Sequence, residues 1–507
     1  MVATTYSDQS EERGRPTADM ITDSDRASRR WRTIWRVHFY SGVLSVPFVL
    51  LMAVTGLVIL YEQPIRDWSQ GTLRTVTDTG AWASFDQQEQ AVEATYPHAS
   101  VVSMTVPRSR SVSTIFGLEN GYEVFVNPYN AKVLGSDDPA GGITGLSRRL
   151  HGFLNNDKLK ISLPSVGAFF DHGSVMREYV VGDLMLEMLG CWGIVLAASG
   201  LYLWWPRASK TARAKTGRRW FNIRLTKRGR ARWRDMHAVP GVVLCGLLVF
   251  VLMSGMPWSA YWGPNFTSFA NTVSPNNWTG APASAIATRG DLDRLGNSIN
   301  WNTGDIPVPS SYSAKADGTG AAPISLDSVV KIGAREGMKP GYSVYFPTNS
   351  VDDAGNPLYG SFTLSNSWPR KTGEARDVFL DQFSGKTLIE QSAYGYGTVS
   401  YAADVLVSTH MGTQLGIVSR IFMTVLCVLT IWAVISAVVM YWKRRRPGTA
   451  GLPRRPAAVK LHTGLWMIIG TTAIIYPLWA VSAALILAFD RFVIRRVPRL
   501  RSAFGQR

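Results

Sequence analysis

Residues 38–61 read HFYSGVLSVPFVLLMAVTGLVILY, an apolar run that opens on a histidine. About 20 such residues in a helix cross the ~30 Å hydrocarbon core of a bilayer. Four further apolar runs of similar length occur, at 184–205, 238–258, 415–442 and 463–489. The first run is too long and too late for a cleaved signal peptide, and no small-residue cleavage site follows it. The sequence therefore predicts an α-helical integral membrane bundle of about five spans.

Basic side chains gather in the short segments between these runs. Residues 206–236 contain twelve Lys or Arg and one acid, and 443–460 contain seven and none. The two long loops, 63–182 and 259–409, carry slightly more acids than bases. Short basic loops stay in the cytoplasm, so we expect the N-terminus inside and the long loops exported. The net charge of +17 is then a signal of orientation, and we expect no nucleic-acid partner.

This pattern divides the chain into alternating spans and loops. The expected segments are a disordered N-terminus 1–30, span 31–62, exported module 63–182, span 183–205, basic loop 206–236, span 237–258, exported module 259–413, span 414–442, basic loop 443–462, span 463–490 and basic tail 491–507. Five spans would export a tail with six Arg and no acid, against the charge rule. The run 463–489 is long enough for one tilted span, and Pro477 is a point where it could break.

The spans and loops repeat a common plan. The first and third spans share a histidine, a glycine four residues later and a hydroxyl–glycine pair after 17 and 18 residues. These are His38, Gly42 and Thr55-Gly56 in one span, and His237, Gly241 and Ser254-Gly255 in the other. Residues 124–134 and 378–388 each read as strand, turn, strand, after short helical patterns near 86–95 and 326–336. The fold expected is an internally duplicated bundle with two exported α+β modules, and 259–325 looks irregular.

Four motifs stand out in the sequence: VFLDQFSGKTL at 378–388, LYLWWPR at 201–207, SGMPW at 254–258 and HMG at 410–412. Together they resemble motifs of the PepSY-associated transmembrane family and its iron-regulated branch. The resemblance covers about residues 30–490, and it implies PepSY-like exported modules and a bacterial inner-membrane location. Members of this branch include a dihaem ferric-siderophore reductase, so the resemblance also implies haem, iron and electron transfer. Fold analogy alone does not transfer function, and the site must carry that argument.

The histidines near the span ends fall at two depths. His38 and His237 open spans that run outward, whereas His151 and His410 precede spans that run inward. Two imidazoles at equal depth suit a low-spin bis-histidine haem b. We therefore predict two haems as metal sites, one held by His38 and His237 near the cytoplasm and one by His151 and His410 near the exported face. The sequence has no CxxCH motif, so attachment would be non-covalent.

Other residues compete for these roles. His172 is an alternative to His151, which stands 32 residues before Asp183 with 155–177 read as an insertion. His462 would be a ligand or an interface residue, and a surface role is favoured for His98. Arg420, inside the fourth span, would bind a haem propionate or pair with Glu187. Similar propionate roles are possible for the following arginines near the histidines: Arg36, Arg149 and Arg234.

The predicted function is a haem-b reductase that passes electrons to a ferric-siderophore at the periplasmic face. The sequence has no GxGxxG after a strand, so the donor is expected to be a separate cytoplasmic protein or a quinol. The alternative is a non-enzymatic PepSY envelope sensor or a peptidase- or peptide-binding protein. A haem or iron transporter is disfavoured by the lack of a polar path, and a zinc or copper site by the lack of clustered ligands.

Overall fold

The structure is a computed structural model and describes residues 23–205, 229–276, 308–311, 322–351, 355, 357–366, 370–445, 451–452 and 463–504. Within these ranges five helical segments are long and apolar enough to cross a membrane. They are Ser28–Leu60, Val181–Trp204, Arg230–Trp258, Ile417–Arg444 and Pro477–Ile494. A multi-span membrane protein is therefore confirmed, and each of these segments overlaps one of the expected apolar runs. Expectations for 1–22 and 206–228 lie outside the described residues.

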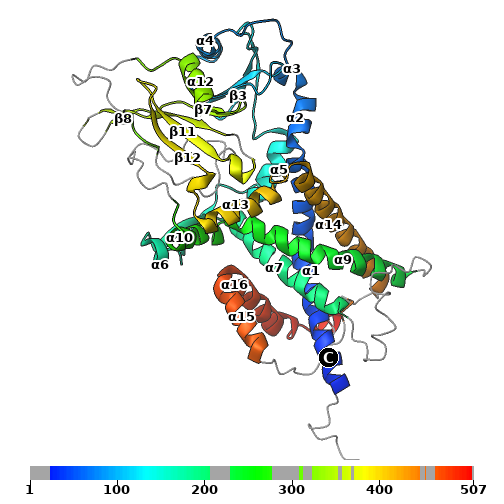
Figure 1. The fold of residues 1–507 in the computed structure, drawn as a ribbon. Helices are drawn as coiled ribbons and strands as arrows, with labels where there is room; N and C mark the ends of the chain where they lie inside the picture. The colour runs from blue at the N-terminus through cyan, green and yellow to red at the C-terminus, as the bar shows by residue number, and fades with distance from the viewer. Residues whose placement is uncertain are drawn as a thin grey trace, which may run out of the picture.

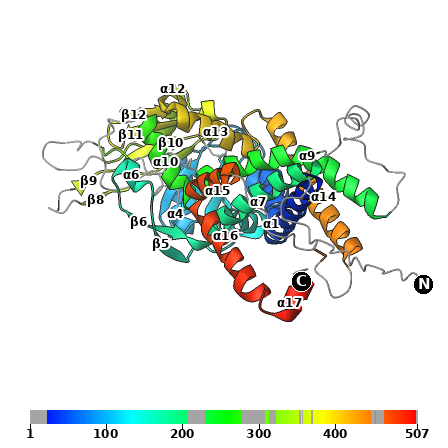
Figure 2. The ribbon, with the colours of Figure 1, turned by 90° about the horizontal axis from the view of Figure 1, so that it is seen from below.

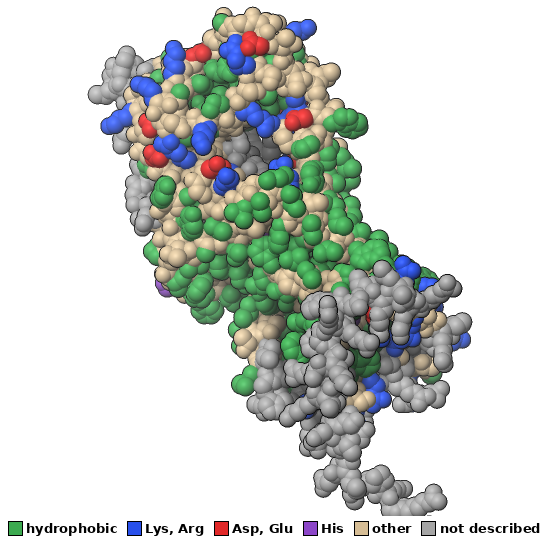
Figure 3. Space-filling view, turned by 45° about the vertical axis from the view of Figure 1, so that its right-hand side comes forward, with side chains coloured by type: hydrophobic (Ala, Val, Ile, Leu, Met, Phe, Trp, Pro, Cys, Tyr) green, Lys and Arg blue, Asp and Glu red, His purple; other side chains and the backbone are tan. Residues whose placement is uncertain are grey.

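Four long helices form the bundle: α1 (Asp23–Leu60), α7 (Val181–Trp204), α9 (Arg230–Gly255) and α14 (Ile417–Arg444). They pack in a ring in which α7 and α14 each contact both α1 and α9. Phe48, Ala197 and Leu248 are among the buried side chains at the centre. The outer surface of the bundle is broadly apolar, with charged side chains at its two ends (Figure 3), as expected of a surface that faces lipid.

An α+β domain built on an antiparallel sheet covers one end of the bundle (Figure 1). Its eight antiparallel strands lie in the order β12-β11-β10-β7-β1-β2-β3-β4. In chain order these are β1 (Val101–Thr105), β2 (Thr114–Leu118), β3 (Glu123–Val126), β4 (Val133–Asp137), β7 (Ser343–Tyr345), β10 (Ser361–Ser365), β11 (Arg376–Asp381) and β12 (Thr387–Ser392). The expected strand–turn–strand units are present as β3–β4 and β11–β12. The end of the bundle next to the sheet is here called the sheet side, and the opposite end the tail side.

The two long loops build this sheet together, which differs from the expectation of two modules. Strand β1 of the first loop pairs with β7 of the second, with Met104 opposite Val344. Helices α4 (Phe85–Thr95) and α12 (Leu326–Arg335) both pack against the sheet, and their residues Val92 and Val329 belong to one buried core. The Ser84 side chain caps α4 in a reciprocal pair with Gln87. One shared core buries more apolar surface than two separate halves would.

Short elements connect the sheet to the bundle. They are α2 (Glu62–Ser69), α3 (Gly71–Arg74), α5 (Gly142–Phe153), α6 (Ala168–Asp171), η3 (Met256–Trp258), α10 (Trp262–Val273) and α13 (Thr398–His410). The segment read as an insertion forms the hairpin β5 (Lys160–Pro164) and β6 (Met176–Val180), with α6 at its tip. Helix α10 contacts both α6 and α13. It lies in a region expected to be irregular, most of which is outside the described residues.

The C-terminal region differs from a single outward span. Helices α15 (Thr463–Ile475) and α16 (Pro477–Phe489) are separated at Tyr476, whose φ of −123° and ψ of 74° are not helical. Proline at the start of α16 lacks the N–H that a continuous helix needs. Leu478 packs with Leu184 near the sheet side, and Ser482 accepts a hydrogen bond from Trp192, which lies about two turns further along α7. Helix α16 therefore runs back toward the tail side beside its neighbour α7. Figure 2 shows the red segment that continues from α16 to α17.

The basic tail continues in the same direction through η6 (Asp490–Ile494) and α17 (Pro498–Ala503). The backbone carbonyl of Phe504 accepts a hydrogen bond of 3.1 Å from Arg36, near the start of α1. The ring of Phe504 also stacks on Tyr40 at 6.3 Å. The tail thus returns to the same end of the bundle as the first residues of α1. This placement removes the conflict between six tail arginines and the positive-inside rule.

Candidate functional site

Four buried or half-buried histidines of the bundle share one arrangement. In each, the ring atom Nδ1 lies within hydrogen-bond distance of a serine or threonine hydroxyl on a neighbouring helix. The pairs are His38 with Ser199 at 3.1 Å, His237 with Ser436 at 3.0 Å, His151 with Thr55 at 2.9 Å and His410 with Ser254 at 3.0 Å. The hydroxyl partner lies in each case close to the end of a membrane-spanning helix. The sequence motif therefore places histidines and hydroxyls opposite one another across helix contacts.

The hydrogen bonds of the hydroxyls determine the tautomer of each ring. Every one of these hydroxyls donates its only proton to a backbone carbonyl of its own helix: Ser199 to Leu196, Ser436 to Ala433, Thr55 to Leu51 and Ser254 to Val251. The hydroxyl oxygen then accepts, so Nδ1 of the histidine carries the proton and donates it. Nε2 is left with an unprotonated lone pair. Among the described residues no hydrogen-bond partner of Nε2 is found, and this form of imidazole is the one that binds a metal.

Glycines lie against three of the four rings. A Cβ atom built at Gly200 would lie 3.1 Å from Cε1 of His38, one at Gly56 3.3 Å from Cε1 of His151, and one at Gly255 3.4 Å from Cε1 of His410. Each glycine directly follows the hydroxyl residue that holds the ring. The fourth site has Ala437 at this place in the sequence. The hydroxyl–glycine pair thus both holds the ring and leaves space for it.

The histidines lie at two levels of the bundle. His38 and His237 lie near the tail side on α1 and α9, the two helices that face each other across the ring. His151 on α5 and His410 at the end of α13 lie on the sheet side, where a charge on His151 would act on His410.

Burial keeps the sheet-side pair neutral. Desolvation lowers the pKa of His151 to about 4. Desolvation, together with the nearby charge of His151, lowers the pKa of His410 to about 4 as well. Both rings are therefore uncharged at neutral pH, with Nε2 free to act as a ligand. No proton would have to leave either ring when a metal binds at neutral pH.

Arg420 supplies a cationic group beside the sheet-side pair. It lies one turn into α14, and its backbone is next to Gly412, two residues from His410. Its Nε atom is buried and has no hydrogen-bond partner within the described part of the chain. The suggested pairing with Glu187 is not formed, because Glu187 accepts the backbone N–H groups of Tyr261 and Trp262 at 2.9 Å each. An unsatisfied buried guanidinium nitrogen is costly, and it fits an anionic ligand group such as a propionate.

The remaining candidates are placed elsewhere or used by other contacts. His172 is exposed with a left-handed backbone, and His98 is also exposed. His462 lies outside the described residues. The other arginines near the histidines have protein partners: Arg36 donates to the Phe504 carbonyl, Arg149 to Asn155 and Arg234 to Asp235. In the described ranges no three His, Cys, Asp or Glu side chains gather as a metal site.

Sequence reasoning missed the role of the hydroxyl residues. It used Thr55-Gly56 and Ser254-Gly255 only as signs of a repeated plan and assigned the hydroxyls no contact. Their constant offset from the histidines was the available signal. Seventeen residues along a helix span about 25 Å, so the hydroxyl at one end of a span cannot reach the histidine at its other end. Thr55 therefore binds His151, whereas His38 of the same span binds Ser199.

The donor set suits haem b at both levels. Each level offers two neutral imidazoles whose Nε2 lone pairs are free, glycine next to at least one ring, and, on the sheet side, a guanidinium nitrogen without a partner. These are the groups that hold a low-spin haem by coordination and packing alone.

Comparison with known proteins places the chain in a family. A search of curated proteins finds no match. A family model described as the PepSY-associated TM region matches residues 35–444, which include all four histidines and the sheet strands. Since this match covers well over half of the 507 residues, the chain belongs to the PepSY-associated TM family.

Proposed function

We propose that the chain is a haem-b oxidoreductase that carries electrons across a bacterial inner membrane and reduces a ferric chelate on its sheet side. The observation that carries the proposal is the pairing of neutral imidazoles at two depths, each with Nδ1–H held by a hydroxyl and Nε2 free. In this proposal the sheet domain lies in the periplasm. The basic tail side lies in the cytoplasm, in agreement with the positive-inside rule.

Bound haem b would supply a one-electron carrier at each level. The chain's own residues hold and orient it. His38 and His237 would ligate on the tail side, and His151 and His410 on the sheet side, while the hydroxyls keep the ligand nitrogens in their unprotonated form. Arg420 would bind a propionate through the nitrogen that has no partner in the described structure.

The proposed function also explains the repeated design of the chain. An internal duplication would give each half one tail-side and one sheet-side histidine, and so one ligand to each haem. The strand order supports this idea, because β1–β4 and β7–β12 extend in mirrored order from the central β1–β7 pair. We propose that each half is a PepSY-like module. The electron donor would be a separate cytoplasmic protein or a quinol.

An optical spectrum of the purified protein tests the cofactor. We expect a red protein with a Soret band that shifts on reduction, and two haems per chain by pyridine haemochrome. His38→Ala and His237→Ala should each remove about half of the absorbance, because both residues serve one iron. His172→Ala is the matched control and should retain both haems. Full haem content in either tail-side variant would refute that pairing.

A second experiment tests the reaction. His410→Ala should keep the tail-side haem reducible but should abolish electron delivery to a ferric chelate added on the sheet side. Unchanged turnover would remove the sheet-side pair from the path. A protein that stays colourless when expressed with ample haem would refute the reductase. Peptide or protein binding by the sheet domain would then be the function to test.

A further inference from the structure

Helix α5 carries large apolar side chains on its outer side. They are spaced like residues on one face of a helix and are here called the apolar stripe: Ile143, Leu146, Leu150 and Phe153. All of them except Leu150 are exposed. The buried side of the helix has small residues: Thr144, Gly145 and Ser147. A helix on the surface of a soluble protein has the opposite pattern, with its apolar residues inward, so this exposed face marks a site of interaction.

Contacts with two spans fix the depth of α5, which lies between the sheet domain and the bundle (Figure 1). His151 of α5 bonds to Thr55, which lies five residues before the end of α1 and so about 7–8 Å inside the end of that helix. Phe153 lies directly against α7, because a Cβ atom built at Gly182 would overlap the Phe153 carbonyl. Gly182 is the second residue of α7 and of its span. The last turns of α5 are therefore level with the sheet-side ends of two membrane-spanning helices.

An ion pair marks the edge of α5 that faces water. Arg148 of α5 pairs with Glu62 at 3.0 Å. Glu62 is the first residue of α2 and lies two residues beyond the end of α1. Charged groups stay outside the hydrocarbon of a bilayer because burying them there is costly. The hydrocarbon boundary on the sheet side therefore lies between Thr55 and Glu62, and α5 contacts the chain at both levels, as a helix in the membrane interface does.

The second half of the chain has a similar helix. His410 ends α13 and bonds to Ser254, which lies one residue before the end of α9. Tyr401 and Leu406 are exposed on α13, whereas Val407 on its other side is fully buried. Both helices that carry a sheet-side histidine therefore present apolar side chains outward at the level of the span ends.

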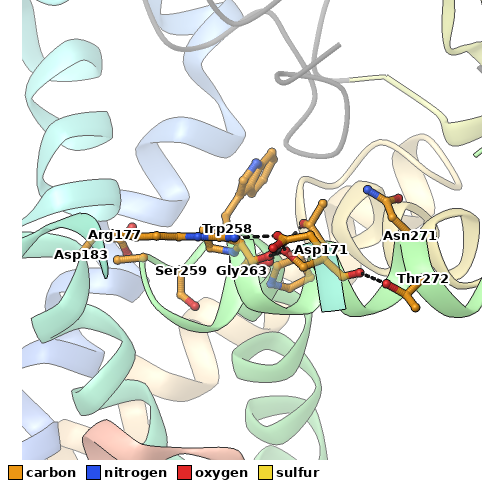
Figure 4. Close-up of a pocket in the computed structure, with 13 residues that line it drawn as sticks. Asp171, Arg177, Asp183, Trp258, Ser259, Gly263, Asn271 and Thr272 are labelled. Atoms are coloured by element: carbon orange, nitrogen blue, oxygen red, sulfur yellow. Dashed lines mark hydrogen bonds and ion pairs between the residues drawn. The ribbon is translucent and has the colours of Figure 1, made fainter. Parts of the chain in front are cut away.

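The chain that follows α5 leaves the apolar stripe uncovered. The hairpin β5–β6 lies against α10, where Ser268 donates to the Asp171 carboxylate and Thr272 donates to the Phe170 carbonyl (Figure 4). Helix α5 itself packs against α1 and α7, so its outer side continues the lipid-facing surface of these two spans. This continuity and the absence of charge in the stripe favour acyl chains as its occupant.

We propose that α5 is an interfacial helix and that acyl chains of the bilayer leaflet on the sheet side cover its apolar stripe. Lipid then forms the outer wall of the site around His151, whereas Thr55 and Gly56 form its inner wall. Only the role of His151 as a haem ligand rests on the function proposed above. The lipid contact follows from the depth of α5 and from the pattern of its side chains.

Spin labels can report the surroundings of the stripe in the full-length protein, held singly in lipid nanodiscs. Leu146→Cys carries the label on α5, with Tyr122→Cys in the sheet domain and Val425→Cys in α14 as matched controls. These three side chains are 42%, 44% and 47% exposed, so differences between them reflect the solvent and not the degree of exposure. The wild type, whose three cysteines lie within the spans, gives the background labelling.

Two collision reagents distinguish lipid from water. Oxygen concentrates in hydrocarbon, whereas a hydrophilic Ni(II) chelate stays in water. We expect the label at Leu146 to collide with oxygen about as often as the label at Val425. We expect it to be at least about fivefold less accessible to Ni(II) than the label at Tyr122, because moving a polar solute into an apolar region is unfavourable.

Two outcomes of the collision experiment would overturn the inference. Equal access of Ni(II) to Leu146 and Tyr122 would place the stripe in water. Low access of both reagents to Leu146 would show that protein, such as a second copy of the chain, covers the stripe.

A second measurement needs no substitution. A phospholipid with a photoactivatable group on its acyl chain should cross-link to the wild-type peptide 142–153 and not to the sheet peptide 114–126. An unmodified 142–153 would contradict the lipid contact. The proposed function fails separately: a colourless protein with Leu146 in lipid refutes the reductase alone, whereas a red protein with Leu146 in water overturns this inference alone.

Discussion

Replacing Gly200 with alanine should disturb the histidine site on the tail side. The distances from the new Cβ to the ring allow its effect to be ranked against other glycine substitutions. The new Cβ would lie 3.1 Å from Cε1 and 3.5 Å from Nδ1 of His38. The first distance is shorter than an ordinary contact, so the ring must retreat by a few tenths of an ångström. His38 cannot do so freely, because Nδ1 donates to both the Leu196 carbonyl and the Ser199 hydroxyl, each at 3.1 Å on the same turn of α7.

The net cost follows from two opposing effects. Overpacking at a well-filled site costs about 1–3 kcal/mol. Alanine within a helix recovers about 1 kcal/mol relative to glycine. The expected balance is a loss of roughly 1 kcal/mol, which corresponds to about fivefold weaker retention of a ligand held by His38. We expect Gly200→Ala to lower tail-side haem occupancy under limiting haem, measured by pyridine haemochrome, and to change the low-spin signals in electron paramagnetic resonance.

Two matched glycine substitutions serve as controls. At Gly42, four residues from His38 on α1, a new Cβ would meet only Leu196 Cδ1 at 3.6 Å, an ordinary contact. At Gly255 it would lie 3.4 Å from His410, at the edge of crowding. Each variant is compared by the haem it loses from the nearer site, which is the tail-side site for Gly200 and Gly42 and the sheet-side site for Gly255. This loss should decrease from Gly200→Ala to Gly255→Ala to Gly42→Ala. If Gly200→Ala matched Gly42→Ala in occupancy and spectrum, the close approach of ring and glycine would not govern the site.

Three other changes test separate parts of the structure. Thr55→Val removes the only partner of the His151 Nδ1 found in the described residues, costing about 1 kcal/mol and loosening the sheet-side haem; Ser199→Ala, which leaves a carbonyl partner, should affect its own site less, and equal haem loss would contradict this. Burial raises the pKa of Glu89 to about 7 from 4.5, so the folded state holds this proton more tightly and loses stability as pH rises from 4.5 through 7. Glu89→Gln should raise the free energy of unfolding at pH 8 by about 1–2 kcal/mol after allowance for solvent screening, which urea denaturation measures. At pH 4.5 the variant and the wild type should be equally stable. A stability difference that does not change with pH would refute the raised pKa. A cysteine at the exposed Ser502 should react with an impermeant maleimide only after cells are opened, and labelling of intact cells would place the tail outside.

The sequence by itself determined much of the membrane architecture. Long apolar runs must form helices in lipid, because unpaired backbone groups are too costly there, so four of the spans could be located from the sequence. The strand–turn–strand units at β3–β4 and β11–β12 were also predictable from alternation and turn residues. The two levels of histidines were predictable from depth alone, because the first and third spans start on one face of the membrane and the second and fourth start on the other.

Only the tertiary structure decided how these parts combine. Two expected modules became one sheet because β1 and β7 pair across 238 residues of separation, and no local pattern encodes such a partner. The break at Tyr476 turned the last apolar run back toward Arg36, a choice made by packing of α16 against α7. The role of the hydroxyls emerged in the same way. Spacing along one helix repeats every 3.6 residues and identifies a face, but whether that face meets lipid, another helix or an imidazole depends on contacts between segments distant in the chain.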